Sequence, residues 1–294
     1  MRRWWIDATS AAGHVADRPH LWLPGALAWI ASGGWLALVI GVIRPPNISE
    51  LTFMGAGIFK SGAWPWNALA IGAAALAAVL IGFGFVSAGE AVLLRGRRAG
   101  RRDVARIFVL GAVCATPTLV VLLAMATAAV VVAPIEFNAP NEQLGPLART
   151  AGRLSLFLVA ILVAASAGAA VHAPAARSVV DGRTIAEALR GSPRTLAGAG
   201  ASAVLQATAV LVARLAYLAV AAIGLRVLWA PIGVRLEAGG MDAAVALLLL
   251  GFVAIWLCLV LGGGALHAWG STSWTRVLGR SRERMERGRS ENLH

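Results

Sequence analysis

Three polar side chains within the apolar part of the sequence have the chemistry of proton transfer or cation binding. Glu90, His172 and His267 each stand near the end of an apolar stretch, the second, fourth and sixth along the chain. If these stretches pack around one axis, a carboxylate and two imidazoles meet in a polar cluster that can relay protons or hold a cation. The alternative is structural, because a polar group near the end of a span reaches water or a backbone carbonyl at little cost.

Arg214 is the most deeply placed charge in the sequence. A guanidinium near the centre of a bilayer costs roughly 3 kcal/mol or more unless it is paired or hydrated. Its position favours the outer half of the fifth apolar stretch, from which it snorkels to the outer surface or pairs with an acidic residue there. A substrate contact is the alternative. The acidic candidates on that side are Glu136, Glu142, Glu237 and Asp242.

A cluster of six arginines lies between the second and third apolar stretches, with little acidic offset. Arginines near an anionic membrane surface each contribute about 1 kcal/mol of attraction, which predicts contact with anionic lipid. The same residues also serve as topology signals, a role that needs no ligand. The six are Arg95, Arg97, Arg98, Arg101, Arg102 and Arg106.

Motifs for cofactors, metals and common catalytic chemistries are absent from the sequence. There is no glycine-lysine phosphate loop, no His-Glu-x-x-His and no Gly-x-Ser-x-Gly. Cys114 and Cys258 lie inside apolar stretches without metal-ligand spacing. We therefore expect no cofactor, no metal and no enzymatic activity; an intramembrane enzyme would depend on Glu90 as its only acidic candidate.

These residues must be positioned by helices that cross a membrane. Of 294 residues, 59% are hydrophobic and 14% charged, a composition typical of a chain surrounded by lipid. About 20 apolar residues span the hydrocarbon core. The sequence predicts an all-α, polytopic transmembrane helix bundle, with a single transmembrane domain over 1–274 and a basic cytoplasmic tail over 275–294. The six expected spans cover 21–43, 66–94, 107–133, 154–172, 196–228 and 243–269.

The distribution of basic residues predicts the orientation. Nineteen arginines fall on the side of the two termini, against five basic residues in the connections of the other side. Basic loops stay in the cytoplasm, so both termini are expected there, in a bacterial plasma membrane. The arginines flank the spans, so the net charge of +12 favours anionic lipid over nucleic acid as partner.

Short amphipathic segments and an internal repeat complete the pattern. Thr184 and Glu187 have the spacing of a capping box, which predicts a helix start. The segments entering the first and fifth spans share an Asp and a Pro twelve residues apart, and the ends of the second and fourth spans read SAGEAV and SAGAAV. Three parallel units, each an interfacial helix plus a transmembrane hairpin, account for this; chance similarity among small-residue helices is the alternative.

The segment 180–190, VDGRTIAEALR, followed by an apolar hairpin, resembles the six-helix membrane domain attached to some bacterial glycerophosphoryl diester phosphodiesterases and to related stand-alone membrane proteins of unknown function. The resemblance implies an accessory role in the membrane and brings no catalytic residue. We therefore expect an accessory, scaffold or lipid-associated membrane protein. The alternative is a permease-type transport subunit that works with a separate ATPase through 101–107 or 184–189.

Overall fold

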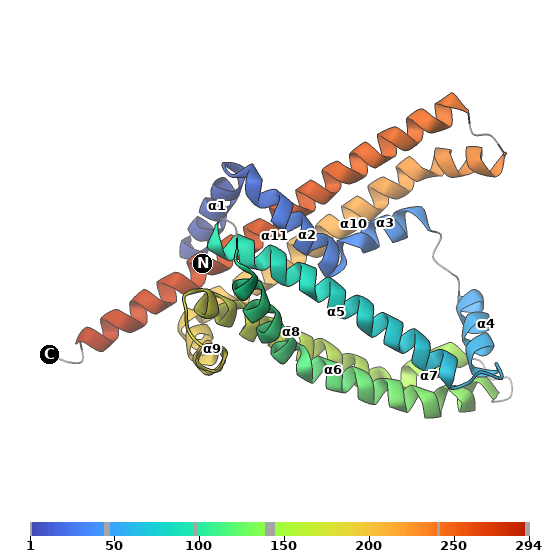
Figure 1. Cartoon of the computed structure of the whole chain (residues 1–294), viewed down its shortest axis with the longest axis horizontal. Coiled ribbons are helices and arrows are strands. Elements are labelled where there is room, and N and C mark those ends of the chain that lie inside the picture. Colours follow the sequence, from blue (N-terminus) through green and yellow to red (C-terminus); the bar gives the residue numbers. More distant parts are fainter. Residues whose placement is uncertain (1, 44–47, 97–98, 139–144, 240–241, 292–294) are drawn as a thin grey trace. The chain divides into compact units, whose positions relative to one another are not determined.

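The computed structural model describes residues 2–43, 48–96, 99–138, 145–239 and 242–291 (Figure 1). This part of the chain is all-α and contains no strand, as predicted. Six helical stretches are long and apolar enough to cross a membrane. They run over Pro19–Val42, Trp66–Arg95, Arg101–Asn138, Ser155–Val180, Ala201–Glu237 and Ala243–Arg280. The chain is thus a multi-pass membrane protein by helix length and hydropathy.

The first span is broken, although its composition is uniformly apolar. It consists of a 3-10 turn (η1, Pro19–Leu21), α2 (Trp22–Trp29), a π-helical turn (η2, Ile30–Gly34) and α3 (Trp35–Val42). Gly33 has a φ of 123°, which a residue with a Cβ rarely adopts. The break follows Trp29, whose ring lies against Gly34 and Gly263.

The remaining spans are long single helices. α5 (Trp66–Arg95), α6 (Arg101–Asn138) and α8 (Ser155–Val180) are the second, third and fourth spans. α10 (Ala201–Glu237) and α11 (Ala243–Glu291) follow. α11 continues through the predicted start of the tail at residue 275 to Glu291.

Four shorter helices lie outside the candidate spans. They are α1 (Arg2–Ala16), α4 (Ile48–Phe59), α7 (Pro146–Arg153) and α9 (Ile185–Ala199). The predicted capping box at the start of α9 is confirmed: Thr184 N–H donates to Glu187, and Glu187 N–H donates to the Thr184 hydroxyl.

The chain forms two compact units whose boundaries fall within α5, α6 and α8. The first unit comprises 1–44, 82–110 and 171–294. In this unit α10 and α11 run side by side (Figure 1), and α2 packs along α11. The second unit comprises 45–81 and 111–170; there Glu136 forms ion pairs with Arg149 and Arg153 of α7. The prediction of one transmembrane domain with a basic tail stays a prediction.

Close packing in the first unit depends on glycines. Gly264 of α11 faces the backbone of Trp22 and Ala26, and an added Cβ would lie 2.5 Å from Ala26 N. Gly25 faces the carbonyl of Gly264 in return. Such approach of two backbones is typical of membrane helices, whose association depends on van der Waals contact.

The first two hairpins share one feature of the predicted repeat. Gly89 of the SAGEAV segment faces the Pro24 carbonyl, and Gly168 of the SAGAAV segment faces the Cys114 carbonyl. Each glycine therefore contacts the other helix of its own hairpin at the same motif position. The third hairpin differs, because Gly264 faces α2 and Gly262 faces the Tyr217 hydroxyl.

α1 is docked on α11 by polar contacts near the middle of α1. Trp269 Nε1 donates to the Ala8 carbonyl at 2.9 Å, and Arg280 pairs with Asp7. Trp4 Nε1 donates to Gln206 Oε1 of α10 at 2.9 Å. The predicted amphipathic face of this segment is therefore divided: its inner side packs on helices, while Trp5 stays exposed.

Candidate functional site

A polar ladder runs along one face of α11 in the first unit. His267, Ser271 and Thr275 are spaced by four residues, which places them one above another on a helix. Three other helices each direct a charged side chain to this face: Glu90 from α5, Arg177 from α8 and Arg214 from α10. We refer to these six residues as the α11 ladder.

His267 lies between two charged groups. Arg214 Nη2 is 3.0 Å from His267 Nδ1, and Glu90 Oε2 is 3.5 Å from His267 Nε2. An arginine only donates hydrogen bonds, so Nδ1 accepts and the imidazole proton resides on Nε2, facing the carboxylate. This arrangement corresponds to a neutral imidazole bridging a cation and an anion.

Ser271 and Arg177 extend the ladder toward the end of the span. The Ser271 hydroxyl donates to Glu90 Oε1 at 2.8 Å. Arg177 Nη2 donates to the Ser271 carbonyl at 2.5 Å, and its Nε donates to the Thr275 hydroxyl at 2.9 Å. Arg177 Nη1 donates to the Ala173 carbonyl on its own helix at 2.6 Å. The guanidinium therefore joins α8 to α11 through several acceptors.

Most of the ladder is shielded, although Thr275 at its end is exposed. The side chains of His267 and Glu90 are 6% and 14% exposed, and Arg177 is 7% exposed as a whole residue. Charged groups in such surroundings are tolerated when they are paired and hydrogen-bonded. Arg214 Nε is the exception: it is buried and has no hydrogen-bond acceptor within the described part of the chain.

The structure brings together two of the three residues expected in the polar cluster. Glu90 and His267 are neighbours. His172 is half-buried on α8 and within electrostatic range of Glu90, but among the described residues no hydrogen bond or ion pair joins it to them. Neither does that part of the chain contain a group of three or more His, Cys, Asp or Glu side chains suited to a metal ion. A carboxylate beside an imidazole is a pair of a kind that can exchange a proton.

An outer acidic partner for Arg214 stays a prediction, and Glu142 lies outside the described residues. Within the first unit, Arg214 Nη2 lies 3.0 Å from His267 Nδ1 on the neighbouring helix. Of the outer acidic residues, Glu136 pairs with Arg149 and Arg153, and Asp242 Oδ1 accepts from Val245 N–H. A partner inside the bundle lets Arg214 form a polar contact without its side chain having to extend to water.

Arg177, Ser271 and Thr275 were not predicted to belong to the site. Arg177 is one of the nineteen arginines on the side of the termini, and a hydroxyl group in a helix carries no distinctive sequence signal. The available signal was the four-residue spacing of His267, Ser271 and Thr275 in an apolar span. The identity of their partners was not readable, because those lie on three other helices.

The arginines between the second and third spans have different surroundings from one another. Arg95 forms a two-bond pair with Asp103, at 2.9 and 3.0 Å, and Arg106 donates to the Arg183 carbonyl. Arg101 and Arg102 are exposed, and the described part of the chain offers them no hydrogen bond or ion pair. Arg97 and Arg98 lie outside the described residues.

Comparison with known proteins identifies no relative of this chain. No protein-family model matches it, and neither a curated protein nor a solved structure does. What the sequence and structure establish is an all-helical, multi-pass membrane protein with six candidate spans.

Proposed function

We propose that this chain is a non-enzymatic, lipid-associated membrane protein that gathers anionic phospholipid where α5 ends and α6 begins. The observation that carries the proposal is the contrast among neighbouring arginines: Arg95 and Arg106 are engaged with protein groups, while Arg101 and Arg102 are exposed at the start of a candidate span. Exposed cations at a span end are positioned for lipid phosphates.

The expected strength of this attraction is modest. Two arginines at about 1 kcal/mol each amount to about 2 kcal/mol, or roughly 25-fold in affinity for an anionic over a zwitterionic lipid. The positive-inside distribution of arginines supports a location of this surface in the cytoplasmic leaflet of a bacterial plasma membrane. Phosphatidylglycerol is a suitable probe of that chemistry.

The α11 ladder supports an accessory or scaffold role over catalysis. Arg177 donates to Ser271 and Thr275 of α11, and Glu90 accepts from Ser271, so these charges join α8 and α5 to α11. Interhelical polar contacts of this kind stabilise membrane bundles. The resemblance of 180–190 to the membrane domain of phosphodiesterases points the same way.

The test compares lipid enrichment in two variants that lose the same charge. The protein is reconstituted in nanodiscs of phosphatidylcholine and phosphatidylglycerol, and the lipids that remain bound after release are counted by native mass spectrometry. Arg101→Gln with Arg102→Gln should abolish phosphatidylglycerol enrichment. The control, Arg226→Gln with Arg235→Gln in the C-terminal part of α10, should retain the phosphatidylglycerol enrichment. Equal enrichment in both double variants contradicts the proposal.

A permease-type subunit is the second candidate, because one contact connects the two segments expected to engage an ATPase. Arg106 of 101–107 donates to the carbonyl of Arg183, the residue before the capping box of α9. A docked ATPase would move both segments together. Affinity purification in mild detergent, followed by measurement of nucleotide hydrolysis, tests this candidate; a preparation without ATPase activity counts against it.

A further inference from the structure

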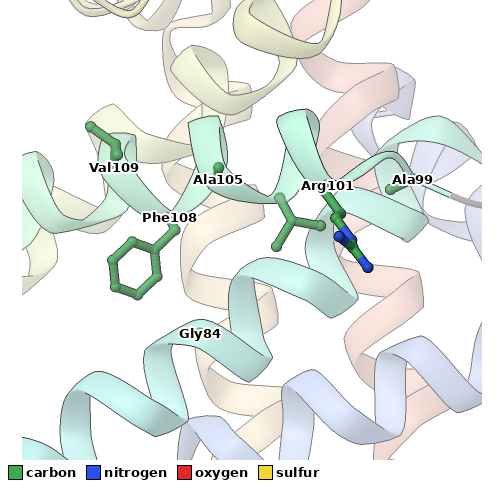
Figure 2. Close-up of a pocket in the computed structure, with 7 residues that line it drawn as sticks. Gly84, Ala99, Arg101, Ala105, Phe108 and Val109 are labelled. Atoms are coloured by element: carbon green, nitrogen blue, oxygen red, sulfur yellow. The ribbon is translucent and has the colours of Figure 1, made fainter.

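A groove lies beside Arg101, between the end of α5 and the start of α6. Its volume is about 400 Å³, within the range of small-molecule sites. Figure 2 shows Arg101 beside the apolar residues that line it. The apolar lining consists of Gly84, Ala99, Val104, Ala105, Phe108 and Val109.

Small residues keep this groove open. Gly84 has no side chain, and a Cβ built there would meet only Phe108, at 4.0 Å. Phe108 itself is held edge-on against Phe83, with ring centroids 5.8 Å apart. Ala105 is exposed on α6 and fills little space. Small side chains on both helices therefore leave the hollow unfilled.

The groove changes from charged to apolar along its length. Arg101 is the first residue of α6, and Val109 lies eight residues further along, about 12 Å deeper at 1.5 Å per residue. Since Arg101 begins a candidate span, this direction leads from the head-group level into the hydrocarbon. A ligand that fits must be anionic at one end and apolar beyond it.

We infer that the groove seats one acyl chain of an anionic phospholipid whose phosphate pairs with Arg101. This inference rests on the proposed function and deepens it, from a diffuse attraction of lipid to a discrete site. Charge complementarity selects the occupant, because the guanidinium of Arg101 is exposed and has no acceptor among the described residues. A free phosphate would leave the apolar lining unoccupied, and a zwitterionic lipid would present an opposing cation to Arg101.

The experiment uses the full chain in vesicles of phosphatidylcholine and phosphatidylglycerol, 3:1, with a trace of phosphatidylglycerol that carries a photoreactive acyl chain. We expect labelling to concentrate on the groove peptides containing Gly84 and 104–109. Ala105→Leu fills the groove without changing charge, and should lower this labelling roughly tenfold, as when about two methylene groups leave an apolar site. Ala124→Leu, an exposed position on the same helix away from the groove, should leave it unchanged.

A second filling variant and a second photoreactive lipid distinguish failure of the discrete site from failure of the proposed function. Gly84→Val fills the groove from α5 and replaces Ala105→Leu if that variant does not fold. A photoreactive phosphatidylcholine should label the groove more weakly, and Arg101→Gln should remove the difference. If both filling variants label like the wild type while phosphatidylglycerol enrichment persists, the discrete site is refuted and the proposed function stands. If enrichment itself does not depend on Arg101 and Arg102, the proposed function fails first.

Discussion

Arginines of the same unit occupy two opposite environments, in the α11 ladder and at the corner between α5 and α6. Arg177 is 7% exposed and donates to Ser271, Thr275 and Ala173. Arg101 and Arg102 are exposed and have no such acceptors in the described chain. A buried guanidinium whose donors are all directed at helices contributes to stability, whereas an exposed one remains available to a ligand. The role of an arginine in this protein thus depends on its surroundings and not on its residue type alone.

The largest expected difference in the free energy of unfolding comes from replacing one arginine in each environment by glutamine. Arg177→Gln should lower the free energy of unfolding by about 3 kcal/mol, because several acceptors on α8 and α11 lose a charged donor. Arg102→Gln, at the corner, should lower it by less than about 0.5 kcal/mol. Unfolding by sodium dodecyl sulfate from mixed micelles, followed by tryptophan fluorescence, measures both. Similar losses in the two variants would contradict a structural role for Arg177 that Arg102 does not share.

A smaller effect is expected from one hydroxyl of the ladder. Ser271→Ala leaves Glu90 without one of its two recorded donors and should cost about 2 kcal/mol, the value typical of a hydrogen bond to a charged group. Thr9→Ala is the control: its exposed hydroxyl donates only to carbonyls of its own helix. The same unfolding titration applies, and a loss for Ser271→Ala no greater than that for Thr9→Ala would argue against a stabilising ladder.

The smallest effect is expected for the exposed Glu187 carboxylate of the capping box, which accepts a hydrogen bond from the Thr184 backbone N–H. A hydrogen bond from the Thr184 backbone N–H is the main cause that lowers the pKa of Glu187 below its usual 4.5, and the Thr184 hydroxyl contributes less. Since the folded-state pKa is the lower one, the contribution to stability is complete above the unfolded value and is lost as pH falls through the folded value. The Thr184 amide resonance should titrate with a midpoint below 4.5. In Glu187→Gln this titration should vanish; a midpoint at or above the usual value would contradict the capping geometry.

Much of the fold follows from local sequence. The six spans lie where apolar runs are long enough to cross a bilayer, and the start of α9 lies where Thr184 and Glu187 can satisfy free amides. These features depend on residues close together in the chain, so a pattern of a few residues is sufficient to predict them. The break at Gly33 could not be predicted in this way, because glycine is frequent in the apolar stretches and nothing nearby in the sequence distinguishes this one.

The partners of the buried charges were decided by tertiary structure alone. The sequence predicts that Glu90, His267 and Arg214 lie in spans, and the depth of Arg214 in its span predicts a partner on the outer side. In the structure, the packing of α10 on α11 brings Arg214 next to His267. Likewise, Arg95 and Arg101 belong to one basic cluster in the sequence, yet only one of them has Asp103 as partner. The reason is physical: lipid and chain length determine where a helix lies along the membrane normal, whereas the rotation of each helix, which selects the neighbour of a charge, follows from contacts between side chains distant in sequence.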